Sequence, residues 1–308
     1  MNKALTVAER DELRSQVDQM VAWSQGAVHV IKQMHLANPD FYGRFGEFES
    51  HLMCLVDSRG ALDLYDGGLR VADAQGRILF DHVDTAAYEE LIEEQAKSWT
   101  YMKFPHLRAL GEQTGWYRVG PLARVVAAEC LSTPLADAER DALMAAHVDH
   151  RPQGSLLYHW ARLIELLHCA ELIRELLDDP EIVGTDILAD FGPRQHEAVG
   201  VIEAPRGTLI HHYRVDENDL VSHCNLIVST THNNQAMNEA IRQVARTYLD
   251  GREGTEGLLN HIEVAIRAYD PCLSCATHAL GQMPLEVDLV DAEGQLVHRA
   301  RRNMAGAA

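Results

Sequence analysis

Two thiols and an imidazole lie close together in the stretch RAYDPCLSCATHALG. Cys272 and Cys275 form the single Cys-x-x-Cys of the sequence, and His278 follows three residues later. Thiolates are preferred ligands of soft transition metals, and imidazole is a common metal ligand. On a helix, the spacing i, i+3, i+6 places the three side chains roughly along one side. The stretch therefore predicts a soft-metal site.

Other interpretations of the thiol pair remain open on spacing alone. The thiols could be buried and unreactive. They could form half of a structural zinc site, although no second Cys-x-x-Cys supplies the other ligands. They could be a redox pair, although such a motif usually belongs to a βαβ unit and this one follows an expected helix. Metal analysis that found zinc at Cys272 and Cys275 would favour the zinc or redox interpretation.

A helix start is expected immediately before the pair. Asp270 is a favoured N-cap residue, and Pro271 is favoured at the first helical position. The positive end of the helix dipole stabilises a thiolate relative to a thiol. We therefore expect Cys272 and Cys275 in the first turns of a helix, in the form that binds metal.

Composition narrows the class of protein. The 308 residues are 46% hydrophobic and 24% charged, as in ordinary globular proteins, and the net charge is −19. Such acidity argues against binding to nucleic acid or to an anionic membrane surface. The most apolar long run, 155–173, is interrupted by three charged residues, and the first residues carry charge where a signal peptide is apolar. We therefore expect a cytoplasmic protein with reduced cysteines.

Hydrophobic periodicity predicts a mainly α fold with small β additions. Thr6 and Glu9 form a capping box at the start of a first helix that ends before Pro39. No linker divides the chain. Further helices are expected over 85–99, 137–149, 155–178, 234–250 and 256–268, with irregular chain over 101–125. A meander is expected over 61–82, two strands joined at 216–218 with an irregular segment at APRG, and a hairpin over 284–300.

Several stretches share a resemblance to one family. DPCLSCATHALG resembles the C-terminal metal motif of the large subunit of nickel–iron hydrogenases, most closely the cytosolic NAD-linked, bidirectional group. YRVGPLAR at 117–124, EAPRGTLIHHY at 203–213 and LIVSTTHNNQAMN at 226–238 are similar to segments of the same family in the same order. The resemblance covers almost the whole chain. It implies the large-subunit fold, which is a helical bundle with peripheral hairpins.

The resemblance also implies the metal ligands. In the family, two Cys-x-x-Cys pairs hold nickel, and an iron with CN and CO ligands shares two of the thiolates. Cys272 is then expected as a terminal nickel ligand and proton acceptor, and Cys275 as the thiolate that bridges nickel and iron. His278 is expected to bind Mg2+ or Fe2+ together with the backbone carbonyl of Leu226.

Further residues are assigned by the same resemblance. Arg206 is expected above the metals, where its guanidinium would polarise H2 or hold the cyanide ligands. Asp270 is expected beside Arg206, Thr230 is expected to donate to a cyanide, and Pro205 is expected to contact the same cofactor. Taken without the resemblance, Arg206 is an ordinary surface arginine, Asp270 an N-cap and Thr230 a strand-end threonine.

The family's first Cys-x-x-Cys pair, in an Arg-x-Cys-Gly-x-Cys motif, does not occur in these 308 residues. We therefore expect an N-terminally truncated large subunit that cannot assemble the centre alone. A catalytically inactive fragment or structural subunit is the alternative. In the family, an endopeptidase cuts after the residue that matches His278, so residues 1–278 are expected as the large-subunit domain and 279–308 as an extension removed on maturation.

The resemblance implies partners as well. Electrons are expected to leave through a small subunit with iron–sulfur clusters, because too few cysteines are paired here to hold a cluster. The resemblance also implies NAD+ as the final acceptor. NAD+ is expected to bind to diaphorase subunits, since no Gly-rich dinucleotide fingerprint occurs in this sequence. The maturation endopeptidase and nickel chaperones are the other expected partners.

Overall fold

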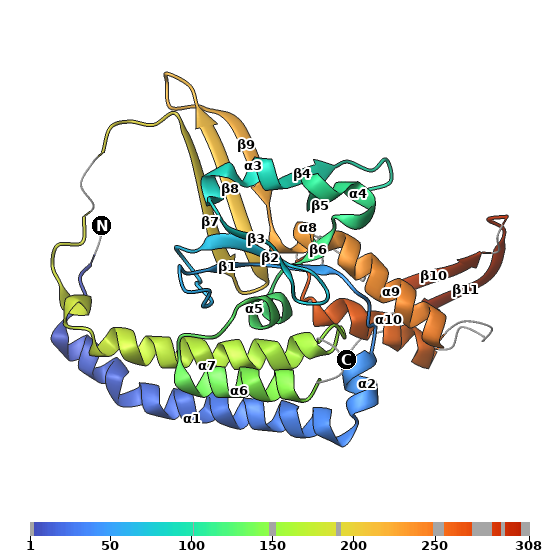
Figure 1. Ribbon diagram of the computed structural model, residues 1–308, viewed down its shortest axis with the longest axis horizontal. Coiled ribbons are helices and arrows are strands. Elements are labelled where there is room, and N and C mark those ends of the chain that lie inside the picture. The colour runs from blue at the N-terminus through green and yellow to red at the C-terminus, as the bar shows by residue number, and fades with distance from the viewer. Residues whose placement is uncertain are drawn as a thin grey trace.

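A layer of long helices supports several small sheets in the structure, which is a computed structural model (Figure 1). It describes residues 3–100, 102–147, 152–188, 192–248, 256–272, 285–290 and 293–302. The expectation of a mainly α fold with small β additions is confirmed. The layer is formed by α1 (Val7–Ala37), α6 (Pro134–Ala145) and α7 (Leu157–Asp178), and α5 (Pro121–Ala127) lies between it and the sheets.

Helix α1 begins and ends where the local signals place it. Thr6 accepts a hydrogen bond from the Glu9 N–H, and the Glu9 carboxylate accepts one from the Thr6 N–H, which completes the capping box. Asn38 ends α1 and caps α2 (Pro39–Arg44), whose first position is the proline. Helix α7 packs along α1 and is buried around most of its circumference, because α5, α6 and α10 cover its other sides.

The first sheet has the order β3-β2-β1-β6, formed by β1 (His51–Val56), β2 (Gly68–Ala72), β3 (Ile78–Val83) and β6 (Tyr117–Arg118). The expected meander corresponds to the β2–β3 hairpin. Strand β1 is not among the expected strands. It is buried from Leu52 to Val56, so it has no alternation of apolar and polar residues that would identify a strand.

The helix expected over 85–99 is wrong in most of its length. Only η1 (Thr85–Ala87) and α3 (Tyr88–Leu91) are helical, and the chain continues as β4 (Ile92–Gln95). Strand β4 pairs with β5 (Phe104–Leu107), which lies in the segment expected to be irregular, as do η2 (Arg108–Leu110) and α4 (Gly111–Thr114). Pairing with β5 and burial of Ile92 outweigh the helical propensity of this Glu-rich segment.

The third sheet has one strand more than expected. Its order is β7-β8-β9, with β7 (Glu197–Ala204), β8 (Gly207–Val215) and β9 (Val221–Ile227). The APRG segment is the tight turn between β7 and β8, and the connection at 216–220 joins β8 to β9. The chain continues through η3 (Pro180–Val183) before this sheet, and through α8 (Ser229–His232), α9 (Asn234–Tyr248) and α10 (Glu256–Ala268) after it.

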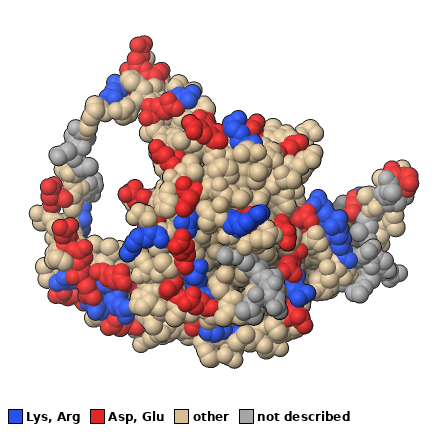
Figure 2. Space-filling model, in the orientation of Figure 1, with Lys and Arg blue, Asp and Glu red and all other residues tan. Residues whose placement is uncertain are grey.

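The expected C-terminal hairpin is confirmed as β10 (Leu285–Val290) and β11 (Leu296–Arg302), which extends from the body beside α9 and α10 (Figure 1). Acidic side chains spread over the helical layer and the outer end of the β7–β9 sheet (Figure 2). No helix in the described ranges is long and apolar enough to cross a membrane.

Candidate functional site

The turn between β7 and β8 lies directly on the Val119–Gly120 segment that precedes α5. Gly207 has φ +139°, and a Cβ atom there would lie 2.3 Å from Cγ2 of Val119. Gly120 has φ +97°, and a Cβ atom there would lie 2.6 Å from the Arg206 carbonyl oxygen. Such distances exclude any side chain. The glycines of YRVGPLAR and EAPRG are therefore explained by this close approach of two backbones.

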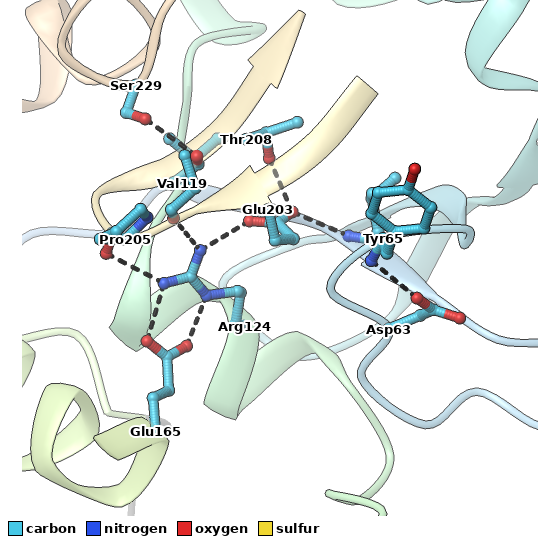
Figure 3. A network of polar contacts seen from close by, with 12 residues as sticks. Asp63, Tyr65, Val119, Arg124, Glu165, Glu203, Pro205, Thr208 and Ser229 are labelled. Carbon is cyan, nitrogen blue, oxygen red and sulfur yellow. Dashed lines mark hydrogen bonds and ion pairs between the residues drawn. The ribbon is translucent and has the colours of Figure 1, made fainter. Parts of the chain in front are cut away.

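A buried guanidinium holds the same turn from below (Figure 3). Nη1 of Arg124 donates to Glu203 and to the Ala204 carbonyl, both at 2.7 Å, while Nη2 donates to Glu165 at 2.7 Å and to the Pro205 carbonyl at 3.2 Å. Burial raises the pKa of Glu203, and Arg124 opposes that rise. The network fixes the backbone of residues 204 and 205, which directly precede Arg206.

Arg206 reaches from this turn to the end of α10. Its Nε atom lies 2.8 Å from Oδ2 of Asp270, and the two side chains are 37% and 54% exposed. Nε itself is buried, and its N–H makes no aligned hydrogen bond in the described part of the chain. The guanidinium therefore keeps donor capacity for a ligand placed beside this ion pair.

Asp270 does not have the extended backbone of an N-cap residue. Its φ is +50°, and its N–H donates to the Arg267 carbonyl at 3.0 Å, so it terminates α10 in the left-handed region. Pro271 and Cys272, expected in the first turn of a helix, are not helical, and the rest of that expected helix lies outside the described residues. The carboxylate of Asp270 faces Arg206 instead.

Cys272 lies beside the first turn of α8. Its backbone N–H donates to Oγ1 of Thr230 at 3.1 Å, and its thiol is free and exposed. The neighbouring Ser229 faces elsewhere, because its hydroxyl donates to the Gly207 carbonyl at 2.9 Å. Thr230 is therefore the residue of this segment whose hydroxyl contacts the Cys272 backbone, and by accepting that N–H it keeps its own proton to donate.

Helix α8 is in turn fixed to the Val119 segment. Asn233 accepts from the Val119 N–H at 2.9 Å and donates to the Val119 carbonyl at 3.2 Å. The Tyr117 hydroxyl lies 2.7 Å from Nδ1 of His232, and burial lowers the pKa of His232 to about 3, so the imidazole is neutral. The segments singled out in the sequence thus meet at one place.

The remaining predicted site residues are only partly placed. Cys275 and His278 lie outside the described residues. Leu226 lies in β9 opposite His211, and Pro205 is exposed at the β7–β8 turn. Within the described ranges, no group of three or more His, Cys, Asp or Glu side chains could hold a metal. The donors that are described, a thiol, a hydroxyl and a guanidinium, suit a thiolate-bound metal with anionic ligands.

Sequence reasoning assigned no role to Arg124, Glu165 or Glu203. Arg124 and Glu203 lie inside the quoted stretches, and Glu165 interrupts the most apolar run of the chain. A charged residue inside an apolar run is the signal that could have identified them, since a buried charge requires a partner.

Comparison with known proteins gives consistent matches. The family model "Nickel-dependent hydrogenase" matches residues 65–278. The chain is 42% identical to the NAD-reducing hydrogenase HoxS subunit beta of Cupriavidus necator, covering 98% of this chain and 64% of that protein. It is 41% identical to one chain of the F420-non-reducing hydrogenase vhc of Methanococcus voltae, covering 92% of this chain and 60% of that protein.

Solved structures agree in fold. An NAD+-reducing [NiFe]-hydrogenase in the H2-reduced state superposes with a TM-score of 0.84 at 50% identity, covering 90% of this chain and 61% of that one. A [NiFeSe] hydrogenase variant from Desulfovibrio vulgaris Hildenborough superposes with a TM-score of 0.64 at 19% identity, which is a likeness of fold alone. The chain spans less than two thirds of the length of these relatives.

Proposed function

The chain belongs to the nickel-dependent hydrogenase family, and on that premise we propose that it supplies part of the nickel–iron site of a [NiFe] hydrogenase large subunit. The reaction is the reversible conversion of H2 into two protons and two electrons. The observation that carries the proposal is the meeting of Arg206, Asp270, Thr230 and Cys272 at the junction of the β7–β8 turn, α8 and the end of α10. These residues come from the segments that resemble the family.

The nickel–iron centre, when bound, supplies the redox chemistry of H2 cleavage. Cys272 would hold nickel through its thiolate, and its sulfur is the base that takes up a proton. The guanidinium of Arg206 cannot release its own proton at neutral pH, so it acts as a fixed cation and donor beside the site. Asp270 orients that guanidinium and balances its charge.

The other assignments remain proposals of the same kind. Thr230 donates its hydroxyl proton to an anionic ligand of the iron, and Pro205 packs against the same ligands. Cys275 would hold the metals through its thiolate, as the resemblance implies. His278 binds Mg2+ or Fe2+ together with the Leu226 carbonyl. Since the 308 residues hold one Cys-x-x-Cys, they supply two of the four thiolates.

We infer the electron-transfer partners with support from one relative, and the processing from the resemblance of DPCLSCATHALG to the family. HoxS subunit beta is named as part of an NAD-reducing hydrogenase. We infer that electrons leave this chain through an iron–sulfur subunit to diaphorase subunits and NAD+, in the cytoplasm. Nickel chaperones and an endopeptidase that cuts after His278 would mature the chain, removing 279–308 from the 1–278 domain.

Metal analysis and H2-dependent dye reduction test the proposal. The chain is purified from cells that contain the maturation machinery, both alone and in a complex with its partner subunits and a separate polypeptide that supplies the other two thiolates. Wild type and Cys224→Ser, which changes an exposed thiol on β9, should bind nickel and turn over in the complex. Cys272→Ser should not turn over, and it should lose nickel or one of the sulfur ligands of nickel. Zinc in place of nickel, or turnover that survives Cys272→Ser, would contradict the proposal.

The alternative is a catalytically inactive subunit. It is favoured by the single Cys-x-x-Cys of the sequence. The same assay separates the two functions. A complex that contains the chain but neither nickel nor turnover supports the inactive role, and one nickel per chain with turnover rules it out. For the chain without partners we expect no turnover.

A further inference from the structure

One face of α7 contacts both sides of the candidate site. One side is the β7–β8 turn, which carries Arg206, and the other is the end of α10, which leads into Asp270 and Cys272. Tyr158, Arg162 and Glu165 are spaced by four and three residues, so they lie on the same face of the helix. The sequence assigned them no role, and they lie outside the four stretches quoted above for their resemblance to the family, although the family model covers them. Tyr158 contacts the Val119 carbonyl, Arg162 contacts the Ala268 carbonyl, and Glu165 contacts the Arg124 guanidinium.

Tyr158 contacts both sides at once. Its hydroxyl donates to the Val119 carbonyl at 3.0 Å, and Val119 lies against Gly207 in the turn that carries Arg206. Its ring packs against Tyr269 with a centroid separation of 4.7 Å, and Tyr269 directly precedes Asp270. Tyr158 therefore fills the space between the turn and the end of α10.

Arg162 contacts the end of α10. Its Nη2 donates to the Ala268 carbonyl at 2.9 Å, at the negative end of the helix dipole. Its Nη1 lies 3.1 Å from Nδ1 of His159. Burial lowers the pKa of Arg162, and the negative charge of Asp270 opposes that effect. Arg162 thus anchors the segment that leads into Asp270 and Cys272.

Glu165 contacts the other side through Arg124. Its Oε2 accepts from Nη2 of Arg124 at 2.7 Å, and its Oε1 accepts from Nε of the same side chain. This pairing of two parallel bonds fixes the guanidinium plane. Arg124 then donates to the carbonyls of Ala204 and Pro205, immediately before Arg206.

We propose that this face of α7 sets the spacing between the two sides of the site, with Arg162 and Glu165 as positioning residues. An α-helix rises about 1.5 Å per residue, so their separation along the axis is fixed by the helix itself. Arg162 acts through Ala268 on Asp270 and Cys272. Glu165 acts through Arg124 on Arg206. The inference deepens the proposed function and depends on it for its catalytic meaning.

Hydrogen exchange in the full 308-residue chain tests the positioning without any metal. Arg162→Gln should speed exchange of the amides of Tyr269, Asp270 and Cys272 by about tenfold or more, because a charged hydrogen bond to the Ala268 carbonyl is lost. Peptides covering 204–208 should keep wild-type rates. Glu165→Asp keeps the charge and shortens the side chain. It should speed exchange in peptides covering 204–208 and leave exchange at 269–272 at the wild-type rate.

Matched controls lie further along the same helix. Arg174→Gln and Glu175→Gln change a half-buried arginine and an exposed glutamate, and both segments should keep wild-type exchange. Faster exchange throughout the chain in Arg162→Gln, or unchanged exchange at 269–272, would contradict the inference. Faster exchange throughout the chain in Glu165→Asp, or unchanged exchange at 204–208, would also contradict it. If Arg162→Gln does not fold, Arg162→Lys gives the same comparison.

Infrared bands of the CN and CO ligands in the complete complex provide a second readout. Arg162→Lys and Glu165→Asp should shift these bands while nickel content stays at the wild-type level, because the donors around the ligands move. Unchanged bands would overturn the positioning role. A wild-type complex without nickel would contradict the proposed function, and the exchange pattern would then decide the structural inference independently.

Discussion

The Nε atom of Arg206, in the turn between β7 and β8, lies 2.8 Å from Oδ2 of Asp270, at the end of α10. The pair joins two segments that are far apart in the sequence and places a cation and a carboxylate next to Cys272. Both groups are partly exposed, so the contact contributes little to the stability of the fold. Its importance lies in the orientation of the guanidinium.

Asp270→Asn should therefore affect turnover far more than folding. Removing the carboxylate leaves Arg206 without its orienting anion, and we expect H2-dependent dye reduction by the complex to fall about 100-fold with nickel content unchanged. The matched control is Asp288→Asn in the β10–β11 hairpin, which breaks the exposed pair with Arg299. A similar loss of turnover in both variants would contradict the role of Asp270.

Arg124→Met should destabilise the fold. The substitution leaves Glu203 buried without its cation and frees the carbonyls of the β7–β8 turn, and breaking such a buried pair typically costs about 3–5 kcal/mol. Urea denaturation of the full chain measures this loss as a lower free energy of unfolding. Arg59→Met, at an exposed pair with Asp57, should stay within about 1 kcal/mol of wild type.

Gly207→Ala should be poorly tolerated. A Cβ atom there would overlap Val119 and sit at φ +139°, so we expect a loss of about 2 kcal/mol or more in the free energy of unfolding. Gly200→Ala, in β7 of the same sheet, has open space around its Cβ position and provides the comparison. Equal stability of the two variants would show that the turn does not need its close approach to Val119.

Stability should decrease as the pH falls below the ordinary histidine range. Burial, and then the neighbouring His147, lower the pKa of His35 to about 4. The folded chain therefore binds fewer protons than the unfolded chain between pH 6.5 and about 4, where an unfolded histidine becomes charged. Stability contributed by neutral His35 is present above pH 6.5 and is lost progressively through this window.

Substitution of His35 tests this pH dependence. His35→Gln removes the titrating group, so the plot of melting temperature against pH should be flatter between pH 6.5 and 4 than for wild type. His29→Gln, at an exposed position on the same helix, should keep the wild-type slope. An unchanged slope in His35→Gln would contradict the assignment.

Local signals in the sequence predict the helices better than the sheets. The capping box at Thr6 and the proline at 39 define α1 because these contacts lie within a few residues of each other. Strands β1 and β4 escape prediction because burial, for β1, and pairing with β5, for β4, decide their conformation. The expectation of irregular chain at APRG misses the turn that carries Arg206.

The candidate site could be predicted only as a set of residue types. Spacing makes Cys272 and Cys275 candidate metal ligands beside other interpretations, and the resemblance adds Arg206, Asp270 and Thr230. Their contacts depend on the meeting of β7–β8, α8 and α10, which no local pattern encodes. Asp270 shows the limit of prediction from local sequence. The residue type suits an N-cap, but in the structure its left-handed backbone ends α10.

X-ray absorption at the nickel edge of the purified complex tests whether Cys272 binds the metal, because it reports which atoms surround nickel. We expect nickel bound by sulfur in wild type and in Cys224→Ser. In Cys272→Ser we expect either loss of nickel or loss of one sulfur ligand. A nickel spectrum in Cys272→Ser identical to that of wild type would contradict the assignment of Cys272 to the metal site.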